Sequence, residues 1–132
     1  MSAAPPPLVL VVDDVPDTRR LMRRVLERAG LTVVEAATGE AALDTIENER
    51  PALVVLDLRL PGITGFDVAR WIRAHADHDI ATTRLLACSA SVQPEVQREA
   101  FDAGADAFEG KPFEVSTFAA RVQRLLDARR PD

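Results

Sequence analysis

Short apolar segments alternate with longer amphipathic segments along almost the whole chain. The apolar segments are rich in valine and leucine and hold few polar side chains, as strands buried on both faces of a parallel sheet do. We expect five strands, at Leu8–Val12, Thr32–Ala36, Leu53–Leu56, Leu85–Cys88 and Ala105–Phe108.

The longer segments carry apolar side chains at helical spacing. In the first of them Leu21, Met22 and Leu26 share one face, and the arginines lie on the other. Pro16 suits the first helical position, and Gly30 suits the turn that ends the helix. We expect helices at residues 16–29, 39–48, 66–76, 94–103 and 114–128.

Five alternations of strand and helix predict an α/β protein with a five-stranded parallel sheet and right-handed crossovers. They fit the flavodoxin-like, doubly wound (βα)5 fold with strand order 2-1-3-4-5. That order places a ligand site at the carboxyl ends of strands one and three, just after Val12 and Leu56. Residues 1–7 are small and proline-rich, so we expect a disordered tail followed by one domain over residues 8–130.

Composition narrows the class of protein further. The 132 residues, 47% of them hydrophobic, suffice for one core but not for two domains. No apolar run approaches the ~20 residues that span a bilayer, and the chain begins without the basic flank of a signal peptide, so we expect a cytoplasmic protein with no membrane partner. A single cysteine, Cys88, excludes an internal disulfide. The net charge of −5 disfavours nucleic acid as a partner and favours proteins.

Acidic side chains follow two strands that the predicted order makes neighbours. Asp13 and Asp14 come after the first strand, and Asp57 comes after the third. Two like charges about 4 Å apart repel by roughly 4 kcal/mol at an effective dielectric constant of about 20, so a cation is required among them. Oxygen ligands without sulfur or nitrogen select Mg²⁺, or Mn²⁺ in its place.

The fourth and fifth strands end near groups that could bind a phosphoryl group. Ser89 offers a hydroxyl, and Lys111, the only lysine among 16 basic residues, offers a compact positive charge. Phosphoryl transfer depends mostly on positioning and charge, and a carboxylate can be its nucleophile. Each residue alone has an ordinary explanation, such as a helix cap for a strand-end aspartate. Their joint placement at four strand ends is the signal.

Four motifs in this arrangement resemble the receiver domains of two-component response regulators, over Leu8–Arg129. They are VVDD with Asp13 and Asp14, LDLRLPGITG with Asp57, the pair Ser89-Ala90, and AGADAFEGKPF with Lys111. The resemblance implies that Asp57 accepts a phosphoryl group from a sensor histidine kinase or a histidine phosphotransfer protein. It implies that Ser89 and Lys111 bind this group, and that Mg²⁺ is held by Asp13, Asp14, Asp57 and the backbone carbonyl of Arg59.

The resemblance also implies a conformational switch. On phosphorylation the Ser89 hydroxyl moves toward the phosphate and Phe108 turns inward, which changes the surface formed by residues 94–103, 105–108 and 114–128. A core aromatic that only packs is the alternative for Phe108. Arg59 and Ser91 occupy positions thought to tune phosphate lifetime, and the Lys111-Pro112 bond is usually cis in the family. His75 and His78, in a polar stretch, are expected to be exposed.

Other classes fit less well. A flavin phosphate would be repelled by the acidic loop DDVPD, and a phosphatase of the haloacid dehalogenase type needs an acid where Arg59 stands. A binding module that works without phosphorylation would usually lack one of the acids or the lysine. We expect a single-domain regulator like those of chemotaxis or the cell cycle, a monomer or weak dimer without catalysis beyond its own phosphorylation and dephosphorylation. It would signal to an effector protein by contact, or serve as a phosphorelay intermediate or phosphate sink.

Overall fold

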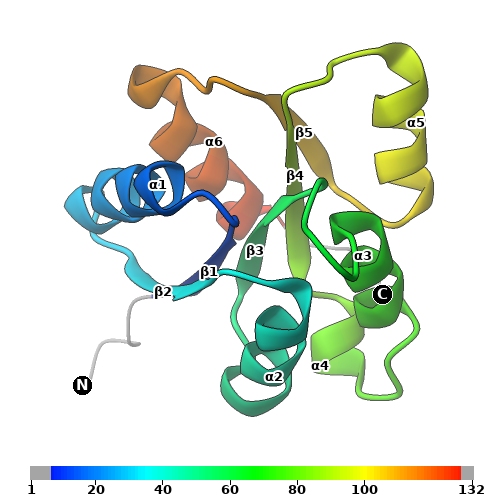
Figure 1. The fold of residues 1–132 in the computed structure, drawn as a ribbon. Helices are drawn as coiled ribbons and strands as arrows, with labels where there is room; N and C mark the ends of the chain where they lie inside the picture. The colour runs from blue at the N-terminus through cyan, green and yellow to red at the C-terminus, as the bar shows by residue number, and fades with distance from the viewer. Residues whose placement is uncertain (1–6, 129–132) are drawn as a thin grey trace, which may run out of the picture.

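The computed structural model describes residues 7–128, which form a central parallel sheet with helices on both faces (Figure 1). The strands are β1 (Leu8–Val12), β2 (Thr32–Ala36), β3 (Leu53–Asp57), β4 (Arg84–Ser89) and β5 (Ala107–Gly110). The helices are α1 (Pro16–Arg28), α2 (Gly39–Glu49), α3 (Gly65–Arg73), α4 (His78–Ala81), α5 (Pro94–Asp102) and α6 (Val115–Asp127).

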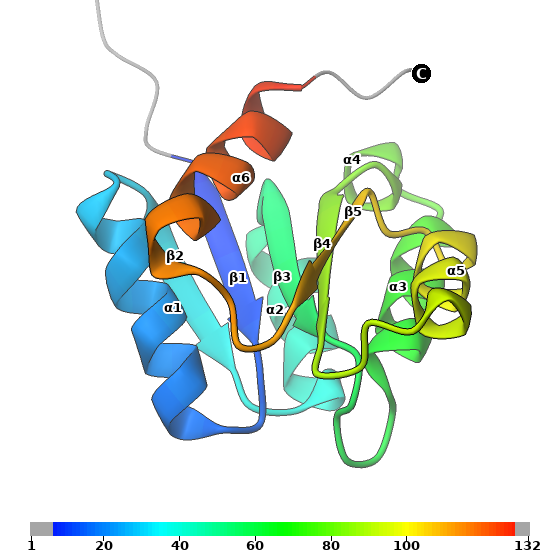
Figure 2. The same ribbon diagram turned by 90° about the horizontal axis from the view of Figure 1, so that it is seen from above.

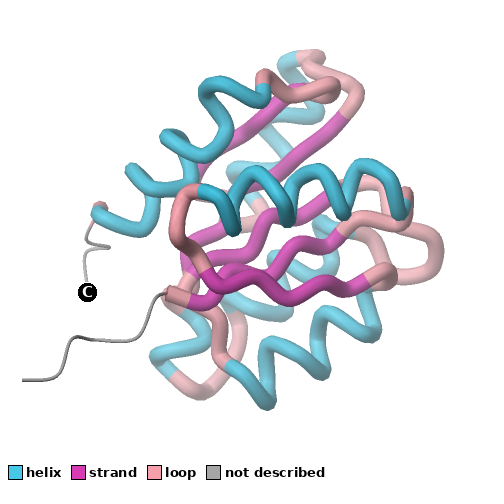
Figure 3. The backbone as a smooth tube through the Cα atoms, turned by 90° about the vertical axis from the view of Figure 1, so that its left-hand side faces the viewer, coloured by secondary structure: helices cyan, strands magenta, loops and turns pink. Residues whose placement is uncertain are grey.

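The strand order is β2-β1-β3-β4-β5 and every pair is parallel, which confirms the predicted flavodoxin-like fold. Successive side chains of a strand point to opposite faces of the sheet, so each strand contributes to two cores. Leu53 and Val55 of β3 pack with α1 and α6, whereas Val54 and Leu56 pack with α2 and α3. The two layers of helices are visible in Figures 2 and 3.

The structure differs from the predicted elements in several details, and the helix expected at residues 66–76 ends already at Arg73. The fifth strand begins two residues later than expected, because Gly104 has a φ of +117° and residues up to Asp106 complete the turn from α5. The short helix α4 was not predicted; it begins after Asp77, whose side chain accepts the N–H of Asp79, and its single buried apolar side chain, Ile80, gives no helical period. Leu21 is 44% exposed rather than part of the core face of α1.

The termini bear on the remaining predictions. Residues 1–6 of the expected tail and residues 129–130 of the expected domain lie outside the described residues. No helix within residues 7–128 combines the length and apolar character needed to cross a lipid bilayer.

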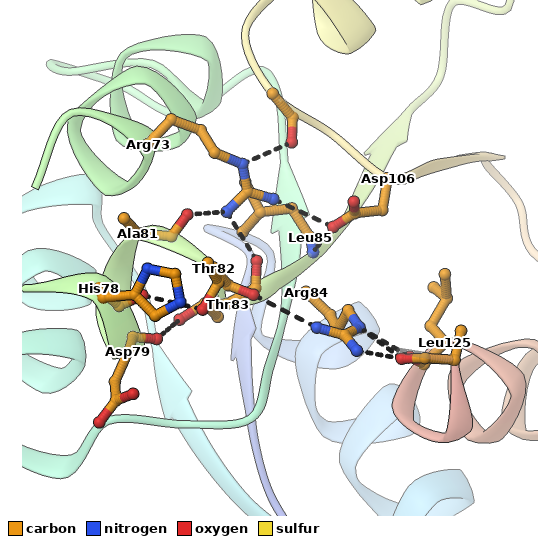
Figure 4. A network of polar contacts seen from close by, with 12 residues as sticks. Arg73, His78, Asp79, Ala81, Thr82, Thr83, Arg84, Leu85, Asp106 and Leu125 are labelled. Carbon is orange, nitrogen blue, oxygen red and sulfur yellow. Dashed lines mark hydrogen bonds and ion pairs between the residues drawn. The ribbon is translucent and has the colours of Figure 1, made fainter. Parts of the chain in front are cut away.

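At the amino-terminal edge of β4, one arginine joins three segments (Figure 4). Arg73, near the end of α3, donates to the carbonyl oxygens of Ala81 at 2.9 Å and Thr83 at 2.7 Å, and to that of Gly104 at 3.0 Å. It also pairs with Asp106 at 3.0 Å.

His75 is less exposed than predicted. Its ring lies 3.1 Å from the Glu47 carboxylate and packs edge-to-face against Trp71.

Candidate functional site

The predicted site residues come together at one edge of the sheet. Asp13 follows β1, Asp57 and Ser89 are the last residues of β3 and β4, and Lys111 follows β5. Because the strands are parallel, their carboxyl ends share this edge. Asp57 is paired in register with Cys88, the residue before Ser89, which places the Ser89 strand end directly beside that of Asp57.

Three carboxylates form the floor of the site. Asp13, Asp14 and Asp57 each offer an oxygen, and these oxygens all lie within 4.8 Å of one another. Asp13 is 0% exposed and Asp57 6% exposed, whereas Asp14 is exposed. A set of close, oxygen-only donors, partly open to solvent, fits a hard divalent cation such as Mg²⁺.

Lys111 supplies the positive charge that balances two of these acids. Its Nζ lies 2.5 Å from Asp13 Oδ2 and 3.3 Å from Asp57 Oδ2. Burial alone would lower the pKa of Lys111, but its hydrogen bond to Asp13 and its attraction to Asp57 raise that pKa overall. The ammonium therefore remains charged at neutral pH.

The surroundings of Asp57 disfavour the ionised form of its carboxyl group. Burial raises its pKa, and the neighbouring charge of Asp13 adds to this effect. The backbone N–H of Arg59, 3.1 Å from Asp57 Oδ1, and the charge of Lys111 oppose the rise without cancelling it. Asp57 thus carries a buried negative charge that is only partly balanced by its partners.

Asp13 is held by contacts that the sequence did not predict. Its Oδ1 accepts the N–H of Val15 at 2.9 Å, and its carbonyl oxygen accepts a hydrogen bond from Arg19 Nη1 at 2.8 Å. Arg19 was expected to lie on the solvent face of α1. Its Nε instead donates to Glu35 Oε1 at 2.7 Å. The signal that could have found this pair is Glu35 itself, the single charged residue of β2.

The residues predicted to switch lie on β4 and β5. Ser89 is buried, and its Oγ accepts the N–H of Ser91 at 3.1 Å. Phe108 is half-buried and packs against the cluster that includes Leu58 and Ala100. The side chain of Arg59 is exposed. The Lys111-Pro112 peptide bond is cis, in agreement with the resemblance drawn from the sequence.

Comparison with known proteins matches residues 9–123 to the response regulator receiver domain family. The chain belongs to this family. The response regulator MprA of Mycobacterium sp. (strain KMS) is 40% identical over 127 residues, which are 96% of this chain and 54% of MprA. The transcriptional regulatory protein KdpE of Mycobacterium tuberculosis is 37% identical over 119 residues, 90% of this chain and 50% of KdpE. This receiver domain therefore spans about half the length of the curated relatives it matches.

Solved receiver structures support the same assignment. The chemotaxis response regulator CheY4 of Vibrio cholerae superimposes with a TM-score of 0.84 at 29% identity, over 91% of this chain and 98% of CheY4. The chain is thus a two-component receiver domain, a signalling class in which Mg²⁺ binding is typical.

In this receiver domain the loop after β3 depends on a glycine. A Cβ atom at Gly65, the first residue of α3, would lie 2.2 Å from the backbone oxygen of Asp57 and 2.7 Å from Leu58 Cα. We expect Gly65→Ala to lower the free energy of unfolding by about 3 kcal/mol, because α3 must move away from the end of β3. Equilibrium unfolding in urea measures this loss.

Gly30→Ala is the matched control for Gly65→Ala. Gly30 has a φ of +93°, but apart from its own chain neighbours no atom lies within 4 Å of an added Cβ. Its replacement should cost only about 1 kcal/mol, from backbone strain alone. Equal losses in the two variants would show that the close contact at Gly65 does not matter.

Proposed function

We propose that this receiver domain accepts a phosphoryl group on Asp57 from a sensor histidine kinase or a histidine phosphotransfer protein. The observation that carries the proposal is the Lys111 ammonium, which contacts both Asp13 and Asp57 at 2.5 and 3.3 Å. An acid held beside a fixed cation, with a hydroxyl at the next strand end, is what phosphoryl transfer to a carboxylate requires.

The oxygen cluster supports a role for a divalent cation. Asp13, Asp14, Asp57 and the backbone carbonyl of Arg59 would hold Mg²⁺, or Mn²⁺ in its place, since the three carboxylates lie within 4.8 Å and include no soft ligand. When bound, the cation supplies positive charge that offsets the phosphoryl oxygens.

The transfer itself needs few groups. A carboxylate oxygen of Asp57 forms a bond to phosphorus as the P–N bond of the phosphohistidine breaks, and the electron pair leaves on the imidazole nitrogen. The Lys111 ammonium binds one phosphoryl oxygen, and the Ser89 hydroxyl donates to another. In this proposal the receiver domain serves signalling, and the phosphoryl transfer to Asp57 is its own part of the chemistry.

A pocket beside Lys111 gives the phosphodonor a place to approach. It has a volume of about 350 Å³ and opens between α1, the residues after β4 and those after β5. Its lining residues are Thr18, Leu21, Ala90, Lys111, Pro112 and Phe113. Leu21 lines this pocket and is exposed, although it is a large apolar residue. A helix of the phosphodonor protein that docks here would cover it.

The output surface in this proposal is the face formed by α5, β5 and α6. In this proposal Phe108 on β5 moves in response to the Ser89 hydroxyl at the end of the neighbouring strand β4. Arg121 of α6 donates to the Phe108 carbonyl oxygen at 2.5 Å. Arg121 also pairs with Glu109 at 3.2 Å. In this proposal a rotation of Phe108 shifts the backbone of β5. The hydrogen bond to Arg121 passes that shift to α6, where an effector protein can bind.

Incubation with acetyl phosphate and Mg²⁺, followed by intact mass measurement, tests the phosphoryl acceptance. We expect one phosphoryl adduct per chain, and none when a chelator removes the cation, because the charge on the phosphoryl oxygens is then not balanced. An adduct of undiminished yield in chelator would contradict the role of the cation. Absence of any adduct, with a phosphohistidine donor as well, would contradict the proposed function.

The mode of output needs a second measurement. An effector adaptor should bind its partner more tightly when phosphorylated, whereas a relay intermediate should return its phosphoryl group to a histidine phosphotransfer protein. We favour the adaptor. Rapid transfer of the phosphoryl group from Asp57 to a histidine phosphotransfer protein would favour the relay intermediate instead.

A further inference from the structure

The first acid of the cluster is fixed through an arginine on α1. We propose that Arg19, held in place by Glu35, is a positioning residue that orients Asp13 for the divalent cation. This inference rests on the function proposed above, in which Asp13 is a ligand, and it adds a residue outside the ligand set.

Asp13 lies one residue past β1, where the sheet no longer pairs all backbone groups. The pairing of β1 with β3 ends at Val12 and Leu56, and the Asp13 N–H donates to the Ala36 oxygen at 3.2 Å. The Asp13 carbonyl oxygen accepts from Arg19 Nη1 at 2.8 Å. Asp13 is fully buried, so the loss of this donor would leave its carbonyl oxygen without a partner. The peptide group after Asp13 would then tend to rotate toward another donor.

Glu35 fixes the direction in which Arg19 donates. Arg19 Nε bonds to Glu35 Oε1 at 2.7 Å, and Arg23 Nη1 bonds to Oε2 at 3.0 Å. Burial tends to raise the pKa of Glu35, but the hydrogen bonds from Arg23 and Arg19 lower that pKa overall, so the carboxylate is ionised at neutral pH. The planar guanidinium of Arg19 thus joins β2 to the backbone of Asp13 with two donors of fixed geometry.

The backbone of Asp13 decides where its carboxylate points. Oδ1 accepts the Val15 N–H at 2.9 Å, and Oδ2 lies 2.5 Å from Lys111 Nζ, on the side of the site. A turn of the backbone would move both oxygens together. Groups that hold a metal ligand in place commonly change metal affinity by about 10-fold or more when they are removed.

Charge and geometry predict opposite results when Arg19 is replaced. The positive charge of Arg19 repels a nearby Mg²⁺ ion, so its removal alone should strengthen the binding of Mg²⁺. Loss of the donor to Asp13 should weaken binding instead. Arg23 is the matched control, because it carries the same charge and contacts the same Glu35, while its hydrogen bonds within residues 7–128 go to Glu27 and Glu35 and not to Asp13.

Titration calorimetry of Mg²⁺ alone into the full chain, without a phosphodonor, tests the proposal. We expect Arg19→Met to bind Mg²⁺ about 10-fold more weakly than the wild type. Arg23→Met should bind at least as tightly as the wild type. Both variants should unfold at a lower temperature without Mg²⁺, since both lose a bond to Glu35, so the difference in affinity separates positioning from a general loss of stability.

Equal Mg²⁺ affinity in the two variants, or tighter binding by Arg19→Met, would overturn the proposal. If Arg19→Met does not fold, Arg19→Lys decides, because a lysine keeps the charge but lacks the two fixed donors that serve Glu35 and Asp13. Weaker binding by that variant supports the proposal, and wild-type affinity overturns it. A wild-type protein that binds no Mg²⁺ would contradict the proposed function instead.

Discussion

Replacement of Asp57 by asparagine should abolish the phosphoryl adduct while leaving the fold intact. The amide lacks the anionic oxygen that forms the bond to phosphorus, yet it has the same shape and can still accept the Arg59 N–H, now 3.1 Å from Asp57 Oδ1. Intact mass after treatment with acetyl phosphate and Mg²⁺ measures the loss. Asp44→Asn, at an exposed position on α2, is the control and should form the adduct as the wild type does.

The same variant should be at least as stable as the wild type in the absence of Mg²⁺. Burial raises the pKa of Asp57, so its ionised form destabilises the folded state. This penalty grows as the pH rises from the ordinary pKa of aspartate to the raised pKa of Asp57, and it is constant above that. Asparagine removes the penalty at neutral pH. The gain should vanish in acid below the ordinary pKa of aspartate, where the carboxyl is protonated in both the folded and the unfolded chain. A phosphoryl adduct that persists in Asp57→Asn would place the acceptor on another residue.

Much of the site could be predicted because it depends on local sequence and strand order. Asp13, Asp57, Ser89 and Lys111 each stand at or just after an apolar strand, and a parallel sheet brings the carboxyl ends of its strands to one edge. The period of the apolar residues decided the strands and the long helices. These features need no knowledge of distant contacts.

The contacts that the sequence did not predict are made by arginine with backbone oxygens. Arg19 reaches the carbonyl of Asp13, and Arg73 reaches those of Ala81, Thr83 and Gly104. Every residue has a backbone carbonyl, so the sequence does not indicate which carbonyl will accept a hydrogen bond. An arginine that binds one therefore cannot be distinguished, from the sequence, from an arginine exposed to solvent. Such contacts follow only from the packed backbone.

Replacement of Arg73 by methionine should destabilise the protein more than the loss of any surface ion pair. The side chain is 16% exposed and bonds to three carbonyl oxygens and to Asp106 (Figure 4). Methionine keeps much of the apolar stem but leaves the Asp106 carboxylate without its guanidinium. We expect a loss of about 3 kcal/mol in the free energy of unfolding, the lower end of the range for breaking a buried ion pair on one side, because Arg73 and Asp106 are only partly buried. Urea unfolding followed by the fluorescence of Trp71 measures it.

Arg70→Met is the control that separates burial from charge. Arg70 lies on the same helix, three residues away, and its carboxylate partners Asp67 and Glu99 are 3.6 and 3.8 Å distant with all three side chains 53% exposed. Its loss should change stability by no more than about 0.5 kcal/mol, as for other exposed ion pairs. Arg73→Lys should recover only part of the loss, because one ammonium cannot reach carbonyl oxygens on α4, before β4 and before β5 together. Similar small losses at both arginines would mean that solvent replaces the Arg73 contacts, and that the helices α3 and α4 are held to the sheet by their apolar packing alone.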